Sequence, residues 1–167
     1  MHFSKIIILS LSAALAAACG GSADQSGGAR SGKVILTAAT LGEQTILSNA
    51  EYRASARYAG ADIGLGERLA LQCRACHSLE AGGADMIGPA LYGVIGRAAG
   101  SRSGFDYSPA LAAGRFVWTL RSLDAWLTAP ARFLPGNRMV YAGLANAADR
   151  DAVIAYLLNV TDDTPGE

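Results

Sequence analysis

The clearest periodic pattern of apolar residues lies near the C-terminus, between about residues 147 and 159. Apolar side chains recur there at the three- and four-residue spacing of one helix face, at Val153, Ile154, Leu157 and Leu158. Asn146 stands at the expected N-cap, where its side chain can accept a hydrogen bond from a free backbone N–H. The pattern predicts a helix that buries one face in a core.

Two further stretches carry helical spacing. One is expected to begin at Asp62 or Gly64 and to run into a pair of cysteines one helical turn apart. The other runs from Ser122, its expected N-cap, to Thr128, because Pro130 cannot continue a helix. Both helices are short and amphipathic.

The remaining segments have weaker patterns. Residues 79–110 are rich in glycine and indicate turns and loops. Residues 43–58 predict a helix lying on the domain, with a partner contact or a spacer as alternatives, and residues 34–36 fit a short strand or a docking segment. No stretch predicts a sheet. We therefore expect an all-α fold whose compact domain covers residues 62–160, followed by a short C-terminal tail at residues 161–167.

The N-terminal segment has the pattern of an export signal. An apolar run from Ile6 to Ala18 follows Lys5 and ends in small residues. Its 13 residues are too few for the roughly 20 that a membrane-spanning helix needs. The pattern predicts a signal peptide at residues 1–18.

Cys19, directly after this run, resembles the lipid-bearing cysteine of a bacterial lipoprotein. Lipidation would also account for an otherwise free thiol in an exported protein. The alternatives are cleavage near Ala18 without a lipid, which gives a soluble periplasmic protein, and an uncleaved anchor. Residues 19–61 are expected to form a Gly/Ser-rich flexible tether and a short N-terminal extension.

Charge narrows the classes of partner. The chain has 14 basic and 14 acidic residues, so its formal net charge is zero, and it contains no basic run. Proteins that bind nucleic acid concentrate positive charge on one surface. The sequence therefore argues against nucleic acid as a partner.

The most informative motif is Cys73-Arg74-Ala75-Cys76-His77. Cys-x-x-Cys-His is the attachment signature of c-type haem. Cysteines at i and i+3 share a helix face, so each can form a thioether to a haem vinyl group. The adjacent histidine is then placed as an axial ligand of the iron. We predict one covalent haem c, bound through Cys73, Cys76 and His77.

Other readings of the motif have less support. A structural zinc site needs four ligands, and the only other cysteine and histidine, Cys19 and His2, lie in the targeting segment. A thioredoxin-like redox pair would stand beside a βαβ pattern, which is absent here.

A second axial ligand is expected from a methionine. Met86 follows His77 by only nine residues, too few to pass around a haem edge, whereas Met139 follows it by 62 residues. A methionine in an apolar setting usually packs in a core, but in a haem-binding chain Met139 is the better candidate.

Several stretches, in this order and spacing, resemble those of class I cytochromes c, the small mitochondrial and bacterial type. They are Gly88-Pro89-Ala90-Leu91-Tyr92-Gly93, residues 96–100, residues 104–108, Trp118, Pro130 to Met139, and residues 149–157. The resemblance covers about 100 of the 167 residues. It implies the cytochrome c fold, in which several short helices and loops surround one haem.

The resemblance also implies roles for individual residues. His77 and Met139 would be the axial ligands, and the Pro89 carbonyl would accept a hydrogen bond from the other ring nitrogen of His77. Gly66 would let the first helix cross close to the last one, near Ala155 and Tyr156.

Three residues are implied as partners of the haem propionates, which need donors when buried. Tyr107, Trp118 and Arg97 occupy the matching positions, although the first two would equally serve as core aromatics and Arg97 as a surface charge. Two positions depart from the family pattern. Trp126 replaces a common tyrosine near the methionine sulfur, and Leu111 replaces a residue that is often polar.

The expected partner surface also departs from the family, because lysines are nearly absent. The segment from Asp62 to Val160 contains nine arginines and eight acidic residues, so long-range electrostatic steering of a partner should be weak. Arg74, Arg132 and Arg138 are candidates for a small basic patch near the haem edge, or for a merely solvated face.

The resemblance implies an electron-transfer protein and not an enzyme. We expect a one-electron carrier between membrane redox complexes, from a quinol–cytochrome c reductase to a terminal oxidase, monomeric and lipid-anchored at the periplasmic face. The alternative is a dedicated cytochrome subunit, or an electron acceptor of a periplasmic dehydrogenase or haem enzyme. A redox or gas sensor ranks last, because no output domain is visible.

Overall fold

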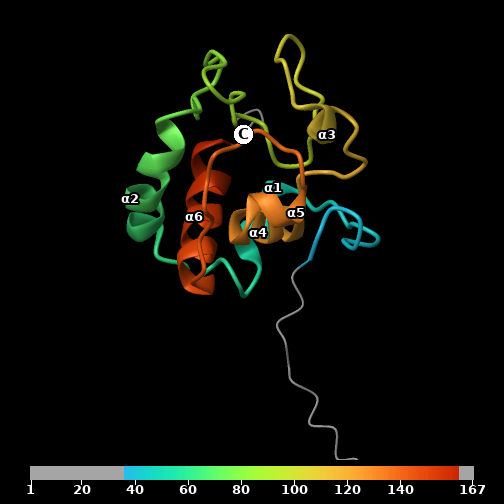
Figure 1. The fold of residues 1–167 in the computed structure, drawn as a ribbon. Helices are drawn as coiled ribbons and strands as arrows, with labels where there is room; N and C mark the ends of the chain where they lie inside the picture. The colour runs from blue at the N-terminus through green and yellow to red at the C-terminus, as the bar shows by residue number, and fades with distance from the viewer. Residues whose placement is uncertain (1–35, 162–167) are drawn as a thin grey trace, which may run out of the picture. The chain divides into compact units, whose positions relative to one another are not determined.

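The computed structural model describes residues 36–161. Six helices form within this range, and the prediction of an all-α fold is confirmed. Among the described residues the only β-type pairing is one isolated bridge between Ala98 and Val117. In Figure 1, α6 (Ala147–Val160) lies near the centre with α2 (Ile63–Arg74) at its left, and long loops, with α3 (Pro109–Ala112) among them, lie above.

The C-terminal helix α6 (Ala147–Val160) forms the centre of the core, as its periodicity predicts. Seven consecutive residues from Ala152 to Leu158 are buried. The side chain of Asn146 caps the helix by accepting a hydrogen bond from the Ala148 N–H at 2.9 Å. Helix α6 is therefore more deeply enclosed than a one-sided amphipathic helix.

Helix α2 (Ile63–Arg74) packs along α6 (Figure 1). Asp62 is its N-cap and accepts a hydrogen bond from the Leu65 N–H at 2.8 Å, as expected. Gly66 is buried where the two helices cross. This crossing fixes the position of the segment that follows α2.

Helix α4 (Leu120–Thr128) begins three residues earlier than an N-cap at Ser122 predicts. Thr119, and not Ser122, is the N-cap, because the Thr119 hydroxyl accepts the Ser122 N–H at 3.3 Å. The Ser122 hydroxyl is fully buried and instead donates to the Val117 carbonyl at 2.7 Å. Pro130 does end α4, but it also begins the short helix α5 (Pro130–Phe133).

The segment before α2 is part of the packed body. Helix α1 (Asn49–Ala54) is shorter than the pattern of residues 43–58 predicted and is closed by a capping box between Ser48 and Glu51. Core positions in this segment are taken by Leu41, Tyr52 and Tyr58. The compact unit therefore reaches upstream of Asp62, where we expected it to begin, because these apolar side chains need the domain to cover them.

Gln44 attaches this segment to the domain. Its side-chain amide donates to the Val117 carbonyl at 2.8 Å and accepts the Val117 N–H at 3.0 Å. It also donates to the Thr119 hydroxyl at 3.0 Å. The side chain thus pairs the backbone N–H and carbonyl of Val117, which the bridge to Ala98 does not use.

The predicted loop region is confirmed, apart from its last residues. Residues 79–108 contain no helix, and the four-residue helix α3 (Pro109–Ala112) follows, with Ser108 as its N-cap. The predicted signal peptide, tether and lipidation site, and all but the first residue of the predicted tail, lie outside the described residues.

Candidate functional site

The two cysteines of the motif lie where α2 ends. Cys73 is in the last turn of α2, and the N–H groups of Cys76 and His77 both donate to its carbonyl, at 3.0 and 2.9 Å. This extra turn brings Cys73, Cys76 and His77 onto one short stretch of backbone. Both cysteines are half-buried free thiols, as thioether formation requires.

The orientation of the His77 ring is fixed by the Pro89 carbonyl. Nδ1 lies 2.6 Å from that oxygen and donates to it, which leaves the lone pair of Nε2 available for a metal. Burial lowers the pKa of His77, so the ring is neutral near neutral pH. Gly88 is required beside the ring, because a Cβ there would stand 2.2 Å from His77 Cε1.

The two candidate methionines differ in burial. Met86 is 51% exposed, whereas Met139 is half-buried and packs on the core together with Cys73. The Met139 N–H donates to Asn137 Oδ1 at 2.9 Å, and Asn137 Nδ2 donates to the carbonyls of Pro130 and Leu134, at 2.9 and 2.8 Å. The structure thus fixes the backbone of Met139 through a single side chain.

Tyr141, two residues after Met139, packs on the same core as Cys73. Burial, followed by the electrostatic influence of Cys73, raises the pKa of Tyr141. Cys73, Met139 and Tyr141 thus come from opposite ends of the domain and pack on one core. This packing, together with the neutral His77 ring and the free thiols, fits a covalently attached haem.

The three residues proposed as propionate partners lie in different surroundings. Trp118 is buried and meets Phe116 edge to face, with ring centroids 4.9 Å apart. Tyr107 is half-buried and packs edge to face on Phe105 at 4.8 Å. The Arg97 guanidinium donates to the backbone carbonyls of two residues that follow Pro89, those of Ala90 at 3.0 Å and Tyr92 at 3.3 Å.

The two departures from the family pattern belong to the core. Trp126 is buried between Trp118 and Phe133, with ring centroids 5.4 and 5.8 Å away. Leu111 is half-buried and packs on the same cluster.

A family comparison decides what this arrangement is. The model of the cytochrome c family matches residues 63–161, more than half of the chain. The chain belongs to the cytochrome c family. Members of this family carry covalently attached haem c, and the single motif of this cytochrome provides for one haem.

Bacterial relatives agree with the assignment. This cytochrome is 49% identical over 85 residues to "Cytochrome c2 iso-2" of Magnetospirillum fulvum, covering 51% of the chain and 88% of the relative. It is 38% identical over 109 residues to "Cytochrome c2" of Agrobacterium tumefaciens (64% of the chain, 98% of the relative). A "Cytochrome c homolog" of Bradyrhizobium diazoefficiens is 39% identical over 103 residues, 61% of the chain, but the match spans only 56% of that protein.

A solved structure supports the fold. Cytochrome cH from Methylobacterium extorquens matches with a TM-score of 0.55 and 35% sequence identity, over 59% of this chain and 99% of that chain. The predicted cytochrome c fold and the single covalent haem are therefore confirmed.

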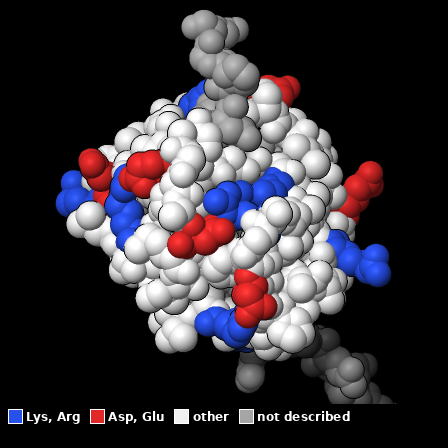
Figure 2. Space-filling view, turned by 90° about the horizontal axis from the view of Figure 1, so that it is seen from above, with Lys and Arg blue, Asp and Glu red and all other residues white. Residues whose placement is uncertain are grey.

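The proposed basic patch of this cytochrome is largely neutralised. Arg74 pairs with Glu80 and also donates to the Tyr156 hydroxyl, while Arg138 pairs with Asp106. Figure 2 shows a mostly uncharged face on which basic and acidic side chains lie next to each other. The arrangement favours short-range docking over long-range steering.

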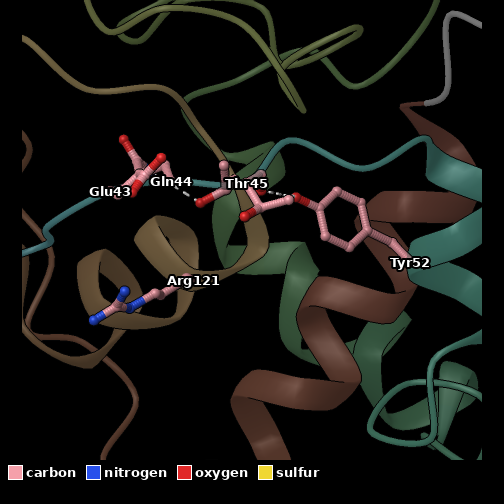
Figure 3. Close-up of a pocket in the computed structure, with 6 residues that line it drawn as sticks. Glu43, Gln44, Thr45, Tyr52 and Arg121 are labelled. Carbon is pink, nitrogen blue, oxygen red and sulfur yellow. Dashed lines mark hydrogen bonds between the residues drawn. The ribbon is translucent and has the colours of Figure 1, made fainter.

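A hollow with a volume of about 200 Å³ lies beside the N-terminal segment. Figure 3 shows its lining, in which Tyr52 points its hydroxyl at the Thr45 carbonyl, 3.3 Å away. Gln44 is likewise engaged with the protein itself. We assign this hollow to the docking of the N-terminal segment and not to a ligand.

Sequence reasoning overlooked several residues that build the site. Asn137 and Tyr141 flank Met139, and Asp85 accepts the Ala90 N–H at 2.7 Å, next to Pro89. The Pro-Gly-Asn turn before Met139 was a visible signal for Asn137. Asp85 carried none, because it lies in an irregular loop and its ion-pair partner, Arg102, is 17 residues away.

No helix among residues 36–161 is long and apolar enough to cross a membrane. Within the same range no group of three or more His, Cys, Asp or Glu residues is placed to hold a metal ion.

Proposed function

We propose that this cytochrome is a one-electron carrier of a periplasmic respiratory chain, working between a quinol–cytochrome c reductase and a terminal oxidase. The observation that carries the proposal is the 2.6 Å hydrogen bond between His77 Nδ1 and the Pro89 carbonyl. It presents a neutral imidazole with Nε2 free, next to two free thiols on the same turn. Haem c bound there supplies an Fe(III)/Fe(II) couple that accepts and releases one electron.

Cys73 and Cys76 would form the thioethers, and His77 and Met139 would be the axial ligands. A thioether ligand opposite a histidine raises the reduction potential relative to a second histidine. Because both axial positions would then be filled by side chains, neither oxygen nor peroxide would find an open site. The proposal is therefore a carrier and not an enzyme.

Pro89 would keep the His77 ring in one tautomer and orientation. Arg97, Tyr107 and Trp118 would donate to the haem propionates, whose burial needs donors. The half-buried position of Tyr107 and the buried one of Trp118 are compatible with this role.

The membrane part of the proposal rests on the sequence. Cys19 would carry the lipid, and residues 19–32 would tether the haem domain at the periplasmic face. The protein would act as a monomer. Confinement to a membrane raises the effective concentration near membrane complexes. The reductase and oxidase would then be reached without strong electrostatic steering.

The packing of residues 36–61 supports the carrier over a dedicated subunit. In a dedicated subunit this segment would be the docking element for the larger partner. Here Leu41, Tyr52 and Tyr58 are instead buried in the segment's own domain. The segment is thus accounted for by folding.

The test is a spectroscopic redox titration of the full-length, haem-loaded protein, combined with carbon monoxide binding to the ferrous form. We expect a strongly positive midpoint potential and no carbon monoxide complex. A negative midpoint would exclude Met139 as ligand, and rapid carbon monoxide binding would favour a sensor.

The respiratory partners need a separate measurement. We expect purified quinol–cytochrome c reductase to reduce the protein and a terminal oxidase to reoxidise it, both at rates above those of outer-sphere exchange with a small reagent. A positive potential with no reaction at either complex would leave an electron carrier but overturn its respiratory position. Globomycin-sensitive processing and labelling with a radioactive fatty acid, both lost in Cys19→Ser, would test the lipid anchor.

A further inference from the structure

One peptide group of the structure is held at both ends. The carbonyl of Pro89 accepts from His77 Nδ1 at 2.6 Å, and the N–H of Ala90, in the same amide plane, donates to Asp85 Oδ1 at 2.7 Å. The Pro89–Ala90 amide therefore connects a carboxylate to the histidine ring through two hydrogen bonds in series.

Asp85 is held as an ionised acceptor. Its carboxylate forms an ion pair with Arg102 Nε, and the Arg102 guanidinium also reaches the Gly83 carbonyl at 3.3 Å. The side chains of Asp85 and Arg102 are 26% and 29% exposed, so the pair is partly shielded from water. The hydrogen bond from the Ala90 N–H, reinforced by Arg102 and Arg97, lowers the pKa of Asp85.

Hydrogen bonds in a chain polarise one another, and those to an ionised acceptor are the stronger ones. A carboxylate that accepts the Ala90 N–H draws the amide toward its charge-separated form and places more negative charge on the Pro89 oxygen. That oxygen then accepts the His77 Nδ1–H more strongly. As Nδ1–H is drawn toward Pro89, Nε2 becomes a better electron donor to a metal.

We propose that Asp85 is a positioning residue that acts through the Pro89–Ala90 peptide to strengthen His77 as a ligand and to lower the reduction potential. A stronger donor at Nε2 stabilises the more positive ferric state, so removal of the Asp85 charge raises the potential. The inference rests on the proposed function in one respect, the ligation of iron by His77.

The decisive variant is Asp85→Asn in the full-length holoprotein. Asparagine keeps an oxygen acceptor of the same size for the Ala90 N–H but removes the charge. Asp151→Asn is the matched control. Asp151 lies on α6, its side chain is 24% exposed, and it pairs with Arg57 and not with the Pro89–Ala90 peptide. Asp85→Glu restores the carboxylate and tests rescue.

We expect the midpoint potential of Asp85→Asn to lie above those of the wild type and of Asp151→Asn. The shift should persist at about 1 M salt, where the Debye length is about 3 Å and through-space effects of exposed charges are screened. In the ferrous, diamagnetic protein, the His77 Nδ1–H should exchange with solvent about tenfold faster than in the wild type, as expected for weakening a charge-assisted bond. Asp85→Glu should move both values back toward the wild type.

Each contrary result overturns the inference. An unchanged potential with only reduced stability would make Asp85 a structural bridge between two loops. If the shift in midpoint potential vanishes at high salt, or if Asp151→Asn reproduces it, Asp85 would act only as a charge through space. If Asp85→Asn does not fold, Arg102→Gln provides the test, because it leaves the Asp85 carboxylate in place without its cation. The midpoint potential of Arg102→Gln should lie below that of the wild type. An unchanged or higher potential contradicts this relay from Asp85 through the Pro89–Ala90 peptide to His77.

Failure of the proposed function is visible separately. It would appear in the wild type itself, as a spectrum without histidine–methionine ligation or as a negative potential. Failure of the relay would leave the wild-type spectrum and its positive potential intact.

Discussion

A Cβ atom at Gly66 would stand 2.1 Å from the carbonyl oxygen of Ala152. The two residues meet where α2 crosses α6, so the backbones of both helices are in direct contact. We expected this crossing near Ala155 and Tyr156; the Tyr156 Cβ is indeed a neighbour, at 2.9 Å, and the Ala152 backbone lies closer still. Because Cys73 is in the last turn of α2, the crossing also sets the position of the haem-attachment motif.

Gly66→Ala is therefore expected to push α2 away from α6. The added methyl group meets backbone atoms that cannot rotate away, and overpacking of this kind costs about 1–3 kcal/mol of unfolding free energy. Gly64→Ala is the matched control on the same helix, because its new Cβ would come no closer than 3.4 Å to Asp62 Oδ1. Urea unfolding of both holoproteins checks this; equal stability of the two variants would contradict the close crossing.

Gln44→Leu tests the attachment of the N-terminal segment. The change removes the acceptor of the Val117 N–H, while the Val117 carbonyl keeps its bond from Ser122. An unpaired backbone donor in a half-buried place costs about 1–3 kcal/mol. We expect a lower melting temperature and faster proteolysis within residues 36–61. Glu43→Ala, at the exposed neighbouring position, is the control and should change the free energy of unfolding by no more than about 0.5 kcal/mol. A similar loss of stability in the two variants would mean that the Gln44 contacts do not matter.

Local signals explain what the sequence revealed of the fold. Helices α2 and α6 were predicted nearly to the residue because apolar spacing and a capping side chain, Asp62 or Asn146, agree at each start. The start of α4 was misplaced because Thr119 and Ser122 are both good N-caps, and only the fold decides that Ser122 is buried. Local spacing alone cannot choose between two such residues.

The N-terminal segment shows a second limit. Leu41, Tyr52 and Tyr58 enter the core without any regular spacing. The weak pattern of residues 43–58 predicted a helix lying on the domain, but it did not indicate these core positions. Their burial depends on surfaces far away in the sequence, such as that around Val117.

The site divides in the same way. Cys73, Cys76 and His77 form a contiguous motif whose chemistry is readable from spacing alone. The Asp85–Arg102 pair spans 17 residues of irregular loop, and neither residue belongs to a pattern. Its connection to His77 exists only once the loop has folded around the Pro89–Ala90 peptide.

The ion pair of Glu80 predicts a pH dependence of stability. Hydrogen bonds from Arg74 and then Ser78 lower the pKa of Glu80 from its usual 4.5 to about 2. A lowered carboxyl pKa contributes stability above pH 4.5, and this contribution is lost as the pH falls toward about 2. Since the side chain is 60% exposed, the contribution should be small.

Glu80→Gln should therefore melt slightly below the wild type at pH 6, and the two melting curves should converge as the pH approaches 2. Thermal unfolding followed by circular dichroism at a series of pH values checks this. A difference that stays constant across the whole series would show that Glu80 contributes packing and not charge.

Asn137 offers the sharpest test of the methionine ligand. One side chain makes three hydrogen bonds: two to the carbonyls of Pro130, at the start of α5, and Leu134, just after its end, and one from the Met139 N–H. Asn137→Ala removes all three at a partly buried site, at a cost of about 1–3 kcal/mol. If Met139 is an axial ligand, the loss should act on the iron as well as on the fold.

We expect Asn137→Ala to weaken the ferric absorption band that reports methionine ligation and to admit carbon monoxide to the ferrous protein. Asn146→Ala is the control, because it removes the cap of α6 at a cost of about 1 kcal/mol while leaving the Met139 backbone untouched. Comparison at equal stability, adjusted with urea, separates the two effects. If Asn137→Ala is destabilised yet keeps the band and excludes carbon monoxide, Asn137 supports only the loop. If both variants lose the band equally, methionine ligation depends on global stability and not on the position of Met139.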